Sequence, residues 1–161
     1  MKKKWIIVAG ALALLLFAMG MGQVRKELPP EFSLQTLEGK VMDYAALKGA
    51  PVVIVFGATW CPECRIEAPE VQKAYLAYKD KGVVFLGVYG GQNDKDVRQY
   101  AEECRITFPA GRDQGQAAYF SVRAIPSILY FASDGRLVKR TVGVTHFDQI
   151  SAAIEKVIEK K

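Results

Sequence analysis

The sequence of 161 residues has few side chains that bind metals: three cysteines and one histidine. Cys61 and Cys64 would need two further ligands to complete a tetrahedral zinc site, and only Cys104 and His146 remain. Covalent haem attachment requires a histidine after the second cysteine, and Arg65 stands there. A lipid-modified N-terminus is excluded because no cysteine precedes Cys61. We therefore expect no metal ligands and no haem.

Acidic side chains are absent from the first 26 residues, which carry five basic ones. The remainder holds 17 basic and 17 acidic residues, so the net charge of +5 belongs to the terminal segment. Because the part of the chain after residue 26 has equal numbers of basic and acidic residues, nucleic acid is excluded as its default partner. The length allows one domain with appendages, and a hydrophobic content of 50% speaks against disorder.

The N-terminal segment contains an uncharged stretch of 18 residues, Trp5 to Gly22. As a helix it would be about 27 Å long, enough to span a bilayer. Three lysines before it and two basic residues after it place the N-terminus in the cytoplasm. The alternative is a cleaved signal peptide, because small-x-small sites occur at residues 18–20 and 20–22. Residues 1–26 are thus expected to be a membrane anchor or signal peptide, and residues 27–161 an exported domain.

The apolar pattern of the exported part predicts alternating strands and helices. The expected order is two strands, a strand–helix–strand–helix unit, a further helix, and a hairpin followed by a helix. The clearest strands are expected at 32–37, 40–42, 52–56, 83–89, 127–131 and 137–142, and helices at 62 to about 80, at 94–105 and from 145 on. This order indicates an α/β sheet with parallel and antiparallel strands.

Three details of the helices are predicted as well. Thr145 and Asp148 suggest a capping box at the start of the last helix. Cys104 falls on an apolar stripe, which favours a buried small side chain over a third redox thiol. His146 is expected to be solvated and receives no functional role.

The chemistry is concentrated where the strand at 52–56 meets the next helix. Cys61 is predicted at the N-cap, where free amides and the helix dipole favour a thiolate. Pro62 falls on the first helical position, which needs no N–H. Cys64 lies three residues after Cys61, so the two can form a disulfide on the first turn. We predict Cys61 as the nucleophile and Cys64 as the resolving thiol, with a purely structural disulfide as the alternative.

The residues around this pair resemble the thioredoxin superfamily, and most closely its membrane-anchored TlpA/ResA-like branch, over about residues 28–161. The resemblance rests on Phe-Gly-Ala-Thr-Trp-Cys-Pro-Glu-Cys at 56–64, on Pro69, and on Ala-Ile-Pro-Ser at 124–127. It implies a thioredoxin-like fold: a central mixed sheet flanked by helices, with an extra N-terminal β-hairpin. It also implies a cis peptide bond before Pro126, facing the cysteine pair. The substrate-contacting residues that follow from it are Trp60, Pro62, Glu63, Ile125 and Pro126.

Two positions concern the proton that accompanies thiol exchange. Thioredoxin has a buried acid where this sequence has Val55. In the ResA-like branch a glutamate beside the second cysteine is functional, and Glu67 matches it. Pattern alone leaves the alternative of a surface glutamate.

Two function classes stay open: a thiol-disulfide oxidoreductase and a non-redox binding module of thioredoxin fold. Within the first, a stabilised Cys61 thiolate favours an oxidant, whereas the Glu63 carboxylate raises the pKa of a nearby thiol and favours a reductant. We predict a reductant whose redox group is the Cys61–Cys64 pair, without a further cofactor. The resemblance implies that the clients are disulfides in exported proteins, and apocytochrome c maturation is the leading candidate process by analogy. It also implies a membrane thiol-transfer protein as the electron donor.

Overall fold

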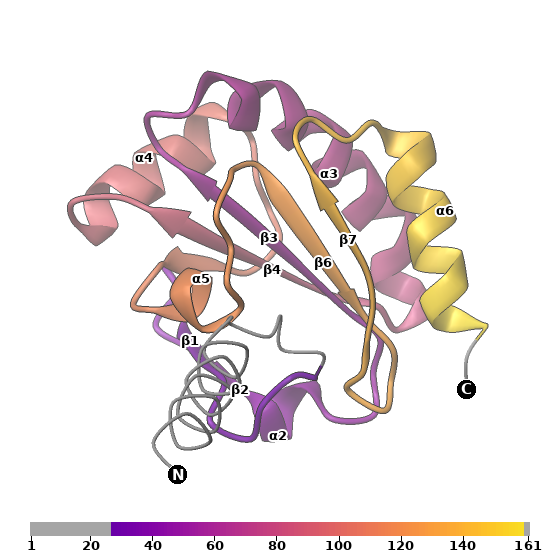
Figure 1. Ribbon diagram of the computed structural model, residues 1–161. Coiled ribbons are helices and arrows are strands. Elements are labelled where there is room, and N and C mark those ends of the chain that lie inside the picture. Colours follow the sequence, from indigo (N-terminus) through magenta and orange to yellow (C-terminus); the bar gives the residue numbers. More distant parts are fainter. Residues whose placement is uncertain (1–26, 160–161) are drawn as a thin grey trace, which may run out of the picture.

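The computed structural model describes residues 27–159 (Figure 1). The chain forms a two-stranded sheet and a five-stranded sheet with the strand order β5-β4-β3-β6-β7. The strands are β1 (Ser33–Gln35), β2 (Val41–Asp43), β3 (Val52–Ala58), β4 (Val84–Gly90), β5 (Ala110–Arg112), β6 (Ser127–Phe131) and β7 (Leu137–Val142). The helices are α2 (Tyr44–Leu47), α3 (Pro62–Tyr78), α4 (Asp94–Glu103), α5 (Gln116–Tyr119) and α6 (Phe147–Ile158), with a short 3-10 turn at Lys79–Lys81.

β3 is the central strand, and all seven of its residues are buried. It pairs in parallel with β4 and antiparallel with β6, so it has a hydrogen-bonded neighbour on each side. An uninterrupted apolar run suits this position because both faces of the strand are covered. The mixed sheet and the N-terminal hairpin confirm the fold class expected from the sequence.

Alternate residues of β3 serve two separate cores. Val53 and Val55 pack with α3 and α6, which lie side by side on one face of the sheet (Figure 1). Ile54 and Phe56 pack on the other face with the N-terminal hairpin and with Phe120, which follows α5. The sheet is therefore fixed from both faces, and its central strand has little freedom to move.

Two predicted details are wrong, and one strand was not predicted. The helix expected at 94–105 ends at Glu103, because Cys104 is its C-cap and Arg105 has a left-handed φ of 55°. The last helix begins after His146 rather than at Thr145, and the Gln149 side chain accepts the His146 backbone N–H instead of an Asp148 cap. β5 was not expected, because its short sequence Ala-Gly-Arg has little strand propensity and depends on pairing with β4.

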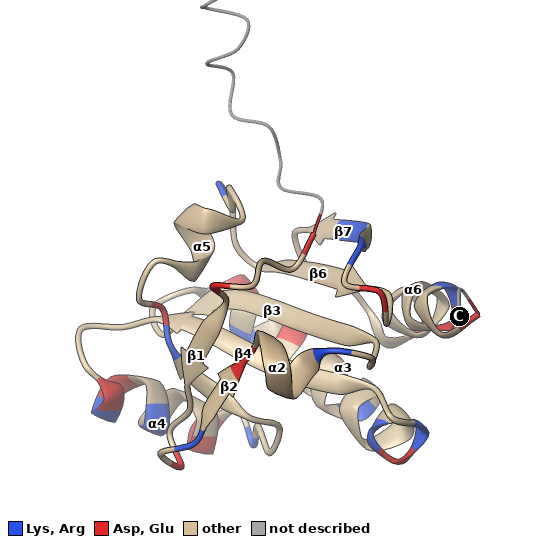
Figure 2. Ribbon diagram, turned by 90° about the horizontal axis from the view of Figure 1, so that it is seen from below, with Lys and Arg blue, Asp and Glu red and all other residues tan. Residues whose placement is uncertain are grey.

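The surface of the described part carries both signs of charge. Figure 2 shows basic and acidic residues interspersed around the periphery in this view. None of the helices between residues 27 and 159 is long and apolar enough to cross a bilayer. The expected anchor or signal peptide at 1–26 lies outside the described residues.

Candidate active site

The cysteine pair lies at the start of α3, as the sequence predicts. Cys61 is the N-cap, Pro62 follows at the first helical turn, and Cys61 and Cys64 form a disulfide with their Cα atoms 5.3 Å apart. The backbone N–H of Cys64 donates to Cys61 Sγ at 3.1 Å. In the reduced protein the same N–H would face the sulfur on which negative charge develops, and a hydrogen bond to a thiolate lowers its pKa.

Exposure does not distinguish the two cysteines, because Cys61 and Cys64 are only 5% and 3% exposed. Cys64 packs against Gly57 at the end of β3. A Cβ atom added to Gly57 would lie 3.3 Å from Cys64 Sγ and 3.1 Å from the ring of Tyr89. A larger residue at 57 would therefore crowd the resolving sulfur.

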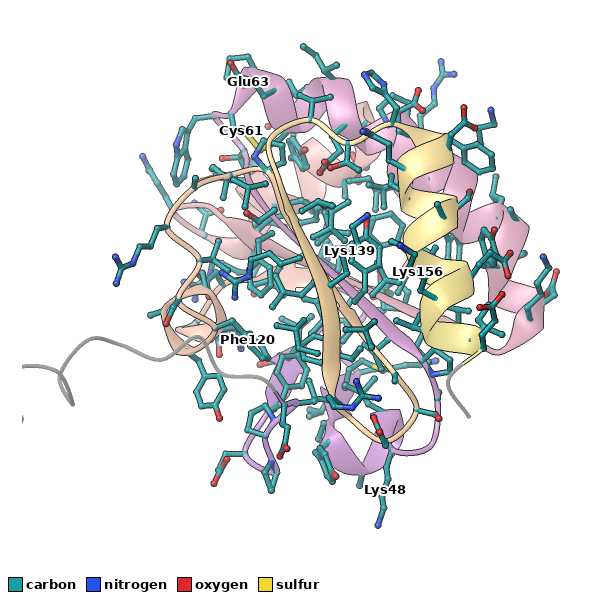
Figure 3. The ribbon with its side chains drawn as sticks, turned by 45° about the vertical axis from the view of Figure 1, so that its right-hand side comes forward. Lys48, Cys61, Glu63, Phe120, Lys139 and Lys156 are labelled. Atoms are coloured by element: carbon teal, nitrogen blue, oxygen red, sulfur yellow. A yellow bond between two sulfur atoms is a disulfide. The ribbon has the colours of Figure 1, made fainter. Side chains whose placement is uncertain are left out.

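The rim of the site is formed by exposed residues next to the disulfide. Pro62 and Glu63 are exposed on the first turn of α3, and Figure 3 shows Glu63 above Cys61 at the end of the sheet. Trp60 is 69% exposed, and its ring covers the backbone of Gly90 at the end of β4. An apolar side chain so exposed beside the cysteines can contact a bound polypeptide.

A second loop reaches the same end of the sheet. In the antiparallel pair of β3 and β6, Phe56 lies opposite Ser127. The residues that follow β3 and those that precede Ser127 therefore lie at the same end of the sheet. The Ile125–Pro126 peptide bond is cis, Pro126 is buried, and Ile125 is 37% exposed. The cis bond implied by the resemblance is present.

Glu67 is a buried carboxyl group on α3, only 1% exposed, so the surface interpretation of this residue is wrong. Its Oε1 accepts the backbone N–H of Thr145 at 3.0 Å. Burial raises the pKa of Glu67 to about 7, against the opposing effect of the hydrogen bonds from Thr145. Within residues 27–159 no cation forms an ion pair with this carboxyl. The position expected to lack an acid, Val55, is buried among apolar side chains.

Thr145 and Tyr89 complete the surroundings of the buried groups, and neither is among the predicted site residues. The Thr-x-x-Asp pattern predicts Thr145 as part of a helix cap instead. Tyr89 stood in an apolar strand, and only the contact with Gly57 across β3 and β4 places it under Cys64. No local pattern in the sequence carries either contact.

Arg65 holds the loop before the cysteines. Its guanidinium donates to the Thr59 carbonyl at 3.2 Å and forms an ion pair of 2.7 Å with Glu103. Cys104 Sγ lies 4.0 Å from Arg65 Nη1. Cys104 is half-buried rather than buried as predicted, and burial raises the pKa of its thiol. A thiol with a raised pKa is a weak nucleophile at neutral pH.

The described residues contain no cluster of three or more histidine, cysteine or acidic side chains that could hold a metal ion. The groups that can react at this end of the sheet are thus the two sulfurs and the Glu67 carboxyl. A buried acid with a pKa of about 7 can exchange a proton near neutral pH.

Replacing Glu67 with glutamine should change how stability depends on pH. Between its ordinary pKa of 4.5 and about 7, Glu67 holds a proton in the folded state that it releases in the unfolded state. The free energy of unfolding of the wild type should therefore decrease as pH rises through this window, by up to about 3 kcal/mol. Glu67→Gln lacks this contribution. The free energy of unfolding of the variant minus that of the wild type should therefore increase from about pH 5 to about pH 8, as measured by denaturant unfolding of the oxidised proteins.

The exposed carboxylate Glu63 provides the control. Glu63→Gln, measured in the same titrations, controls for the loss of a carboxylate from the same helix. Parallel curves for the wild type and Glu67→Gln would show that Glu67 is not protonated on folding.

Comparisons with known proteins agree with this geometry. The model of the AhpC/TSA family matches residues 25–139. The thiol-disulfide oxidoreductase ResA of Bacillus thuringiensis (strain Al Hakam) is 30% identical over 137 residues, which cover 84% of this chain and 79% of that protein.

Two solved structures share the fold. A thiol:disulfide interchange protein of the thioredoxin family from Chlorobium tepidum superposes with a TM-score of 0.74 at 23% identity, covering 85% of this chain and 99% of the other. A secreted Mycobacterium tuberculosis disulfide oxidoreductase homologous to Escherichia coli DsbE gives a TM-score of 0.68 at 23% identity, covering 78% and 96%. The chain therefore belongs to the AhpC/TSA family, has a thioredoxin-like fold and is a thiol-disulfide oxidoreductase of the ResA type, with its CxxC pair at positions 61 and 64.

Proposed function

We propose that the protein reduces disulfides in exported proteins, with Cys61 as the attacking thiol. The observation that carries the attacking role of Cys61 is its position at the N-cap of α3, where the Cys64 backbone N–H donates to its sulfur. The direction of electron flow rests instead on Glu63. That N–H and the helix dipole stabilise a thiolate on Cys61.

The exchange takes place in two steps that leave the client with two thiols. The Cys61 thiolate attacks one client sulfur, which breaks the client disulfide and forms a mixed disulfide. Cys64 then loses its proton and attacks Cys61 Sγ, which closes the Cys61–Cys64 disulfide and releases the client as a dithiol. Two electrons pass from the protein to the client.

Glu67 is proposed to accept the proton that Cys64 loses. Its buried carboxyl has a pKa of about 7, so both protonation states are accessible near neutral pH. Thr145 donates its backbone N–H to the carboxyl and thereby favours the ionised, proton-accepting form.

The exposed rim is proposed to bind the client chain. The backbone of Ile125 would pair with it in the manner of a short strand, while Trp60, Pro62 and Glu63 contact it from the α3 side. This proposal is supported by the positions of the two loops, because the pairing of β3 with β6 brings both to the same end of the sheet. Apocytochrome c is the leading client class by analogy with ResA-type relatives.

The direction of electron flow is proposed from Glu63. Its carboxylate next to the nucleophile opposes a thiolate and makes the reduced form less stable, which makes the couple more reducing. A thiol oxidase is the second candidate, favoured by the Cys64 N–H that donates to Cys61 Sγ. A reductant outside the cytoplasm needs electrons from across the membrane, so a membrane thiol-transfer protein is the proposed donor.

The proposed location is the extracytoplasmic side of the cell membrane. The uncharged residues 5–22 would form one membrane span, and the similar M. tuberculosis protein is a secreted one. A cleaved signal peptide, which would release a periplasmic or secreted domain, is the alternative.

Replacing Cys64 with alanine should trap clients on Cys61. Without the resolving thiol, the mixed disulfide has no internal route to break down. Non-reducing electrophoresis of cells expressing Cys64→Ala should show mixed disulfides that dithiothreitol removes, and Cys61→Ala should show none. Comparable trapping through Cys64 would reverse the assignment of the two thiols.

Replacing Glu63 with histidine should make the couple more oxidising. An imidazolium beside Cys61 lowers its pKa, and each unit corresponds to at most about 30 mV. The measurement is the glutathione redox equilibrium at about pH 7 and 9, beside a titration of the Cys61 thiolate. Glu63→Gln, which removes the charge without adding one, should fall between the two. If the pKa falls while the potential becomes more reducing, Glu63 does not set the direction.

Cell fractionation should test the membrane span. The full-length protein should sediment with membranes and resist extraction by high salt and carbonate, because residues 5–22 are uncharged. A soluble form beginning near residue 21 or 23 would instead identify a cleaved signal peptide.

A further inference from the structure

Arg140 of β7 is a half-buried cation without an anionic partner among residues 27–159. Its guanidinium donates to two backbone carbonyls, those of Phe120 and Ser121, the latter at 3.1 Å. Burial lowers the pKa of Arg140, and its Nε has no hydrogen-bond partner in the part of the chain that the structure describes. Burying a charge costs free energy unless it is paired, so the two carbonyls are its main compensation.

The two carbonyls lie at the end of α5, where the chain turns away from the core. Phe120 is fully buried and contacts Phe32, Phe56 and Phe131. Figure 3 shows Phe120 well below Cys61, toward the opposite end of the sheet. The next residue, Ser121, has a left-handed φ of 51°, a conformation that costs free energy outside glycine. Arg140 therefore stabilises, through its two hydrogen bonds, the strained turn that the chain makes at Ser121.

The segment that begins at this turn is the loop that ends with the cis peptide bond. At its far end the Ser127 hydroxyl donates to the Ala124 carbonyl at 2.7 Å, and the Gly143 N–H donates to the Pro126 carbonyl at 2.9 Å. Between the two attachments, residues 123–125 are exposed. The direction in which Ile125 presents its backbone thus depends on both ends of the loop.

We propose that Arg140 is a positioning residue for client recognition: it holds the start of the 121–126 loop so that Ile125 is placed for backbone pairing with the client. The inference rests on the proposed function, in which the client pairs with Ile125. Arg140 acts through the loop and does not contact the reacting sulfurs.

The position of Arg140 explains why its replacement should weaken polypeptide binding and leave the reaction with a small disulfide unchanged. The cysteines are held by β3 and α3, whereas Arg140 bonds only the segment that leads into β6. Loss of its bonds removes two attachments from the start of the loop. The hydrogen bonds of the α5 turn remain, from the Ser121 and Val122 N–H groups to the carbonyls of Ala118 and Ala117, and the N-cap of α3 stays intact. Binding of a polypeptide should then weaken, while attack on a small disulfide that needs no backbone pairing should not.

The experiment compares two substrates across three variants of the full-length protein. Arg140→Met keeps an apolar stem and removes both bonds, Arg140→Lys keeps the charge and can bond one carbonyl, and Lys139→Met removes the neighbouring cation of the same strand as a control. The substrates are a peptide closed by a single disulfide and the small aromatic disulfide 5,5′-dithiobis(2-nitrobenzoate). Thermal unfolding and the Cys61 thiolate titration accompany the kinetics.

For Arg140→Met we expect a rise of about tenfold in KM for the peptide, with kcat, the small-disulfide rate and the Cys61 pKa unchanged. Arg140→Lys should recover part of the peptide KM, and Lys139→Met should match the wild type. If Arg140→Met does not fold, the partial effect in Arg140→Lys carries the same test.

Three results would overturn the proposal. An unchanged peptide KM in the folded Arg140 variants would show that the loop needs no fastening. An equal loss with both substrates would show general damage to the site. A wild-type protein that reduces the small disulfide but not the peptide would refute client reduction itself, and the role of Arg140 would fall with it.

Discussion

The pairing of β3 on both of its edges is the constraint on which the site depends. Parallel pairing with β4 and antiparallel pairing with β6 fix the point at which β3 ends, and α3 begins at Pro62 after three intervening residues. Cys61 thereby becomes the helix N-cap. The pairing of β3 with β6 also brings the loop before Ser127 to the end of the sheet where α3 begins. One strand therefore positions both the nucleophile and the proposed client-binding loop.

The site combines a buried carboxyl group, proposed to accept a proton, with exposed side chains that are proposed to contact the client. Glu67 is buried against Thr145, whereas Glu63 and Trp60 are at the rim. Two arginines hold the loops on either side through backbone carbonyls: Arg65 bonds Thr59, and Arg140 bonds the residues that precede the cis-proline loop. Every residue has a backbone carbonyl, so these bonds impose no requirement on the side chains of the two loops. The loop sequences can therefore vary with the client while the arginines maintain the loop conformation.

Local patterns in the sequence were sufficient for most of the fold and for the cysteine pair. The apolar run of β3 and the Cys-Pro-Glu-Cys motif each depend on neighbouring residues, and both were interpreted correctly. The partners of Glu67 were not accessible in this way, because Thr145 is 78 residues away and meets it only after α6 packs on α3. β5 was missed for a similar reason, since its strand conformation comes from β4 rather than from its own residues.

The assignment of the two thiols requires that the N-cap makes Cys61 the more acidic and more reactive thiol of the reduced protein. The direct measurement is the rate of iodoacetamide alkylation of each cysteine as a function of pH, with the modified position identified by fragmentation mass spectrometry. Cys61 should be modified first at every pH, with an apparent pKa below the ordinary thiol value of about 8.5. Alkylation of Cys64 as fast as or faster than that of Cys61 would show that the N-cap does not set the order of reactivity.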